Sequence, residues 1–268
     1  DNLIERGINQ IYLIGGSNTF KSAALIYEEI KRRKLKIGIC VLLKAINKDV
    51  AIFDTCFGFE SAVEETQRFI EMAYAPQSHI TTQSVTIFII SALIKVPGWE
   101  SGFLASDAVR AARNVNICLV PEFPYCFYGS GGLLDTLATE SSIEEVVLSH
   151  TLKVPANQLL TFPRIQIPQS FDNFFKQEIL NYLEKDNLAS DVVFLDTNNA
   201  VRSIPANSLD TKFAGKFRVF SQIAHSSIYG LMCGYTNFVC GHFAMRNGMV
   251  PLPEMMERKN KFQLRPED

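Results

Sequence analysis

The sequence lacks a C-x-x-C pair, a strong excess of charge of either sign, and an apolar run long enough to cross a bilayer. Its six cysteines are scattered over 268 residues, which argues against zinc and disulfide scaffolds and favours a reducing compartment. With 26 basic and 28 acidic side chains, net charge attracts neither nucleic acid nor an anionic membrane. The most apolar segment, residues 85–96, is too short for a membrane helix. These absences predict a cytoplasmic protein without a bound metal, a nucleic-acid partner or a membrane partner.

What the sequence does contain is a repeated alternation of short apolar runs and helical patterns. Residues 10–14 form an apolar run that ends at Gly15 and Gly16, and apolar residues then recur at helical spacing up to a basic run. The same order returns along the chain, with strands predicted at 36–43, 84–93, 116–123, 146–150 and 191–196 and helices at 61–74, 101–113, 131–140, 174–185 and 217–234. Strands separated by helices predict an α/β fold with mainly parallel sheets flanked by helices.

Polar residues gather where these predicted strands end, which is where α/β folds bind ligands. The run GGSNT, which starts at Gly15, can hold a phosphate on backbone N–H groups, although it is neither a Walker loop nor G-x-G-x-x-G. The run KAINKD offers one carboxylate, Asp49, and VPEFPY holds Glu122 between an apolar strand and a proline. Taken singly, each run is also consistent with an ordinary solvated loop.

Taken in order, the runs GGSNT, KAINKD, FGFESAVEETQR, VPGWESGF and ICLVPEFPY resemble the phosphofructokinase family, especially its plant-like and protist branch. The corresponding family runs read GGDGT, PKTIDND, FGFDTAVEEAQR, LMGRxSGF and CLIPExPF. Toward the C-terminus, NAVRSIPAN and GLMCGYTNF are similar to Y-x-x-R-x-IPSN and GAMAGYTGF. The resemblance implies a two-lobed fold, with a donor-phosphate lobe from residues 1–61 and 204–232 and a sugar-phosphate lobe from residues 62–203 and 233–268.

The family is known for moving a terminal phosphate from ATP or pyrophosphate to fructose 6-phosphate with magnesium. The resemblance therefore implies that Gly15 and Gly16 lie at the cofactor phosphates. It also implies that Glu122 and Arg202 bind the sugar phosphate.

Three positions depart from the family pattern at the residues that carry its chemistry. Ser17 stands where the family has the aspartate at the magnesium, Asn47 where it has the general base, and Trp99 where it has an arginine. An amide cannot accept a proton at neutral pH, and a neutral ring cannot replace a cation on a phosphate. Lys44 and Asp49 match the family. We therefore expect these five residues to be a vestige of a catalytic site and expect no cofactor.

These departures favour a pseudoenzyme that acts as a structural or regulatory subunit. Its expected partners are proteins, in a homo-oligomer, in a hetero-oligomer with phosphofructokinase-like chains, or in a larger assembly such as a cytoskeletal one. One alternative is an active 6-phosphofructokinase that uses ATP or pyrophosphate with magnesium, with Asp49 as its base. The other is a binding module that senses a sugar phosphate through Arg202.

Overall fold

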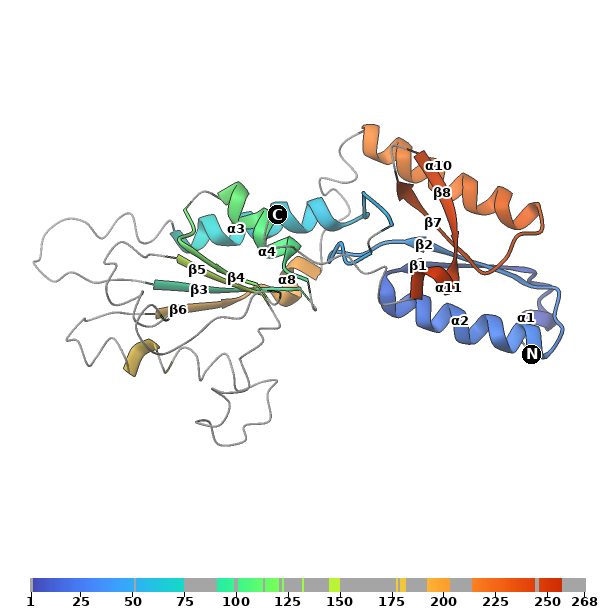
Figure 1. Ribbon diagram of the computed structural model, residues 1–268, viewed down its shortest axis with the longest axis horizontal. Helices are drawn as coiled ribbons and strands as arrows, with labels where there is room; N and C mark the ends of the chain where they lie inside the picture. Colours follow the sequence, from blue (N-terminus) through green and yellow to red (C-terminus); the bar gives the residue numbers. More distant parts are fainter. Residues whose placement is uncertain are drawn as a thin grey trace, which may run out of the picture. The chain divides into compact units, whose positions relative to one another are not determined.

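The chain divides into two compact units that are interleaved in sequence. Unit 1 holds Asp1–Ser61 and Pro205–Gln263, and unit 2 holds Ala62–Ile204 and Leu264–Asp268 (Figure 1). The computed structural model describes residues 2–50, 52–74, 91–98, 101–112, 114–120, 122, 132, 145–149, 177, 179–181, 192–202, 214–243 and 246–256.

Unit 1 is built on a four-stranded sheet with strand order β1-β2-β7-β8. Strands β1, β2 and β7 are parallel and β8 is antiparallel to β7. Helix α2 packs against β1 and β2, and α10 packs against β2, β7 and β8, so the two helices cover opposite faces of the sheet (Figure 1). The elements of this unit are α1 (Asn2–Glu5), β1 (Gln10–Gly15), α2 (Ser17–Arg32), β2 (Gly38–Leu43), α10 (Ala214–Met232), β7 (Phe238–Phe243), β8 (Arg246–Pro251) and α11 (Leu252–Met256).

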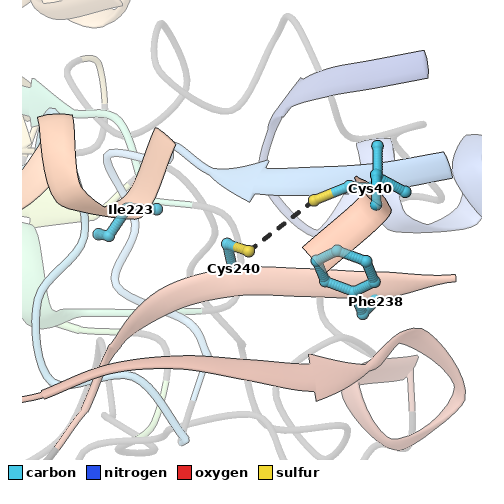
Figure 2. Packing of buried hydrophobic residues seen from close by; sticks show 5 residues of the cluster. Cys40, Ile223, Phe238 and Cys240 are labelled. Atoms are coloured by element: carbon cyan, nitrogen blue, oxygen red, sulfur yellow. Dashed lines mark hydrogen bonds between the residues drawn. The ribbon is translucent and has the colours of Figure 1, made fainter. Parts of the chain in front are cut away.

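One buried cluster of unit 1 lies between α10 and the sheet. Figure 2 shows Cys40 of β2 and Cys240 of β7 facing each other among Ile223 and Phe238. Their Sγ atoms are 3.8 Å apart and both cysteines are free thiols. The hydrogen bond with Cys240, together with burial, raises the pKa of Cys40 far above its ordinary value. Cys40 therefore packs as a neutral, small apolar side chain.

Unit 2 is built on a four-stranded parallel sheet with strand order β4-β5-β3-β6. Four residues of β3, Ala92, Leu93, Ile94 and Val96, are fully buried, as expected for an interior strand covered on both faces. Helix α4 packs against β4 and β5, and α8 packs against β3. The remaining elements are α3 (Phe59–Tyr74), which begins in unit 1, β3 (Ser91–Val96), α4 (Phe103–Ala112), β4 (Ile117–Leu119), β5 (Glu145–Ser149), β6 (Val192–Asp196) and α8 (Asn198–Arg202).

The predicted α/β class, with mainly parallel sheets flanked by helices, is confirmed. The predicted lobes differ from the two units in the last segment, because we assigned residues 233–268 to the second lobe. Strand β7 pairs with β2, and residues up to Gln263 belong to unit 1, so that assignment is wrong for residues 233–263. The helix predicted at 131–140 lies outside the described residues, apart from Gly132. No helix in the described part of the chain has the length and apolar character of a membrane span.

Candidate functional site

In unit 1, two predicted site loops meet at the carboxyl edge of the sheet. Strands β1 and β2 are parallel neighbours that end in register, Gly15 opposite Leu43. The Lys44 N–H donates to the Gly15 carbonyl at 3.0 Å, which holds the start of the second loop against the end of β1. Parallel strands bring the residues after their carboxyl ends to one edge. The geometry therefore places Ser17 and residues 44–49 together, as the sequence order predicts.

Asp49 is the buried carboxylate of this edge. Its side chain is 8% exposed, and the Ser17 hydroxyl donates a hydrogen bond to its Oδ2 at 3.2 Å. The other oxygen, Oδ1, is buried and has no hydrogen-bond partner among the described residues. Ser17 is also the first residue of α2, and a negative charge beside a helix N-terminus is favourable. The carboxylate thus lies beside a neutral hydroxyl at the end of a helix.

The two glycines before α2 lie in closely packed positions. A Cβ on Gly16 would lie 3.0 Å from the Ala45 Cβ, and one on Gly15 would lie 2.0 Å from the Thr19 Oγ1. The second loop therefore packs directly against the turn that precedes α2. This packing accounts for Gly15 and Gly16 without a bound phosphate, so their predicted cofactor role stays a prediction.

The rest of the 44–49 loop is anchored by Cys56 and by aromatic contacts. The Cys56 sulfur accepts a hydrogen bond from the Ala45 N–H at 3.1 Å, and the thiol donates one to the Ala45 carbonyl at 3.0 Å. Lys48 has a left-handed backbone with φ of 51°, and its Nζ lies 5.2 Å from the centre of the Phe59 ring, within the range of a cation–π contact. Lys44 pairs with Phe57 in a short parallel bridge. Asn47, between these anchored residues, is half-buried.

In unit 2, Glu122 caps the first turn of α4. The Gly102 N–H donates to Glu122 Oε1 at 2.8 Å, while Oε2 is buried and has no hydrogen-bond partner among the described residues. A Cβ on Gly102 would lie 2.6 Å from the Val120 Cβ and 2.7 Å from Glu122 Oε2, so only glycine fits. Burial, and then the nearby Glu122 carboxylate, raises the pKa of Cys118 to about 11.

Arg202 is the last residue of α8, directly downstream of β6. Glu122 follows β4, and β4 and β6 are the two edges of the same sheet. Three inter-strand spacings separate those edges, which amounts to about 14 Å. The two residues predicted to bind a sugar phosphate therefore follow opposite edge strands. Trp99, the remaining predicted site residue, lies outside the described residues.

Sequence reasoning missed several contacts in and near these sites. It did not identify Gly102 as the partner of Glu122, although a glycine before a helical pattern is a recognised helix-start signal. It also missed Cys56, for which the local pattern contains no signal.

The residues present offer sparse ligands for a magnesium ion. Among the described residues, no group of three or more His, Cys, Asp or Glu side chains could hold a metal. Asp49 supplies one unpartnered carboxylate oxygen, and its hydrogen-bonding neighbour is the hydroxyl of Ser17. The second carboxylate that the family resemblance places at the metal is absent at this position. Among the described residues of this edge, one carboxylate alone does not form a complete site for a resident divalent cation.

Comparison with known proteins gives one consistent result. The family model described as Phosphofructokinase matches residues 1–189. The chain is 34% identical to ATP-dependent 6-phosphofructokinase 1 of Arabidopsis thaliana, over 97% of this chain and 54% of that protein. It is 31% identical to the chloroplastic ATP-dependent 6-phosphofructokinase 4 of the same plant, over 98% of this chain and 49% of that protein. The chain thus spans about half the length of these relatives.

Solved structures show the same fold at low identity. A pyrophosphate-dependent phosphofructokinase from Marinobacter aquaeolei matches with a TM-score of 0.71 and 14% identity, over 99% of this chain and 64% of that chain. The phosphofructokinase from Saccharomyces cerevisiae matches with a TM-score of 0.66 and 17% identity, over 94% of this chain and 32% of that chain. These likenesses concern the fold alone.

Proposed function

This chain belongs to the phosphofructokinase family, and we propose that it is a member without phosphoryl-transfer activity that serves as a structural or regulatory subunit. The observation that carries this proposal is the environment of Asp49. Its neighbours in the loop and at the helix start are an amide, Asn47, and a hydroxyl, Ser17, which donates to Asp49 at 3.2 Å. Neither group can act as a general base or as a carboxylate ligand.

The energetic cost of these replacements is large enough to remove activity. A positioned general base contributes roughly 10²–10⁴ in rate. An electrostatic donor at the transferred phosphate contributes several kcal/mol more, and about 1.4 kcal/mol is tenfold in rate. Even with strong non-additivity among the three replaced positions, turnover should be negligible.

A repair series tests this proposal. Asn47→Asp alone should remain inactive, because a restored base is useless without the carboxylate at the metal and the cation on the phosphate. The same holds for Ser17→Asp alone. Only the combination Ser17→Asp, Asn47→Asp and Trp99→Arg returns all three groups that the family resemblance implies. Recovery of turnover by Asn47→Asp alone would show that the rest of the site is competent and would overturn the proposal.

An active 6-phosphofructokinase is the second candidate function. Two observations favour it: Asp49 keeps a buried, unpartnered oxygen, and curated relatives are named ATP-dependent 6-phosphofructokinases. In this case Asp49 would take the proton from the attacking hydroxyl, and ATP or pyrophosphate with magnesium would be the donor. Asp49→Ala would then abolish a measurable rate, whereas the pseudoenzyme has no rate to lose.

A sugar-phosphate-sensing role is compatible with loss of catalysis. The unpartnered Oε2 of Glu122 supports it. Calorimetry with fructose 6-phosphate tests this role. Binding that is weakened by Arg202→Ala and by Glu122→Gln supports it, and absence of heat rejects it.

The subunit role requires a protein partner. We propose an oligomer of this chain or a mixed oligomer with a phosphofructokinase-like chain in the cytoplasm, because the packing residues of the fold match the family while its reactive positions do not. Size-exclusion chromatography with light scattering on protein from its source tests this role. A monomer without a companion at cellular concentration would contradict it.

A further inference from the structure

Lys95 is a buried cation at the carboxyl end of the central strand of unit 2. It is the penultimate residue of β3, where it is 8% exposed, and it lies between paired residues of β5 and β6. Its Nζ is 3.5 Å from Asp196 Oδ2, the last residue of β6. Lysine is seldom buried to this extent. A lysine inside an apolar central strand therefore calls for a specific reason.

The backbone of Lys95 holds the next residue of the chain after β6. Thr197 donates to the Lys95 carbonyl twice, from its N–H at 3.0 Å and from its Oγ1 at 2.8 Å. Thr197 is 1% exposed, and its own carbonyl accepts the N–H of Val201 at 2.9 Å in the first turn of α8. Lys95 therefore contacts both residues of the β6–α8 junction, one through its ammonium group and the other through its carbonyl.

We propose that Lys95 is a positioning residue for a phosphate-binding site on α8, in which Arg202 contacts a phosphomonoester. Asp196 and Thr197 connect Lys95 to α8. This inference rests on the proposed sugar-phosphate-sensing role. Because α8 has only five residues, it has little rigidity of its own. Its orientation is then set by the junction.

Stability alone is a poor reason for this lysine. A buried ion pair contributes little net stability because removal of the charges from water offsets their attraction, and apolar replacements are often neutral or stabilising. Asp196 is partly exposed, with 44% of its side chain accessible, which weakens the pair further. The charge of Lys95 therefore serves better to hold the β6–α8 junction in one arrangement than to stabilise the fold. Loss of the charge should then affect ligand affinity more than it affects folding.

The test combines calorimetry with a double-mutant cycle on the full chain. Fructose 6-phosphate and inorganic phosphate are titrated into wild type, Lys95→Met, Lys95→Arg, Arg202→Ala and the double variant of Lys95→Met with Arg202→Ala. Lys95→Met should weaken fructose 6-phosphate binding about tenfold with an unchanged or higher melting temperature, and Lys95→Arg should restore most of the affinity. In the Arg202→Ala background, Lys95→Met should have little further effect. Asp107→Asn serves as the control, because its pair with Arg110 is a surface pair on α4.

Two results would overturn the inference. One is a set of losses that add across the cycle, which would mean that Lys95 acts independently of Arg202. The other is a loss of affinity that merely follows a loss of melting temperature.

Hydrogen exchange at the Val201 amide separates this inference from the function on which it rests. Exchange should be faster in Lys95→Met than in wild type and unchanged in Asp107→Asn. If wild type binds neither compound, the sugar-phosphate role fails, and faster exchange still supports the positioning of α8 by Lys95. Unchanged exchange at Val201 in Lys95→Met overturns the inference whether or not a ligand binds.

Discussion

The loop sites of the two units differ in what has changed. In unit 1 the loop packs closely, with Gly16 against Ala45, but the groups beside Asp49 are a hydroxyl and an amide. In unit 2 the carboxylate of Glu122 matches the family residue and also caps α4 through Gly102. A residue that supports the fold cannot change without a cost in stability, whereas a residue that serves chemistry alone can. We infer that the difference between the two sites follows from that.

The largest expected effect comes from Gly102→Ala. The new Cβ would lie 2.6 Å from the Val120 Cβ, an atom attached to the main chain that cannot rotate away. Relief requires movement of the α4 N-terminus and loss of the Glu122 cap. We expect a loss of about 2–4 kcal/mol in the free energy of unfolding, measured by urea denaturation.

Gly16→Ala in unit 1 is the matched control for that change. Its Cβ would lie 3.0 Å from the Ala45 Cβ, a contact that a shift of a few tenths of an ångström relieves. We expect a loss of about 1 kcal/mol. Equal losses of unfolding free energy for the two variants would contradict the view that only the unit 2 site depends on a glycine that the surrounding packing cannot replace.

Alkaline pH should destabilise the protein, in part through Cys118 beside Glu122. The pKa of this thiol is about 11 in the folded state against an ordinary value of 9.0. Below pH 9.0 the thiol is neutral in both states, so the stabilisation is complete. As pH rises, the unfolded state ionises first and stability falls up to about pH 11. Between about pH 9 and pH 11, Cys118→Ala should reduce the fall in the free energy of unfolding by roughly 1–3 kcal/mol.

Denaturation of both proteins at a series of pH values measures this effect. The raised pKa of Cys40 should leave a further alkaline loss in the variant. A fall of equal size in wild type and Cys118→Ala would show that the environment of Glu122 does not disfavour the thiolate.

A smaller loss of stability than that of Gly102→Ala is expected for Ser17→Ala. Asp49 would lose the hydrogen bond to Oδ2 while it remains buried, at a cost of about 1–2 kcal/mol. Ser22→Ala is the control on the same helix, because the Ser22 hydroxyl bonds the Asn18 carbonyl at an exposed position. A loss no larger than that of the control would show that the Ser17 hydroxyl does not stabilise the carboxylate.

The sequence predicted those parts of the molecule that local patterns determine. The apolar run that contains β3 was predicted as a buried strand. The order of the strand ends also predicted that Ser17 and Asp49 lie at one edge of a sheet. Strands β7 and β8 were missed because Gly241 interrupts the apolar alternation. That glycine is required by Phe53, whose ring would lie 2.5 Å from an added Cβ, and no local pattern reports a contact between residues so distant in sequence.

The pairing of Lys95 with Asp196 was missed for the same reason. The two residues lie in register on neighbouring strands but are far apart in sequence, and a lysine inside an apolar run was interpreted only as part of a strand. Contacts of this kind depend on which strands become neighbours. Local composition does not determine that order.

The most direct test of the central claim is a coupled assay of phosphoryl transfer to fructose 6-phosphate, with magnesium and either ATP or pyrophosphate. The purified wild-type chain is expected to show no turnover above a blank, because Ser17, Asn47 and Trp99 replace the groups that the reaction needs. Asp49→Ala should give the same blank value. Turnover by wild type that disappears in Asp49→Ala would contradict the claim and would identify the chain as an active kinase with Asp49 as its base.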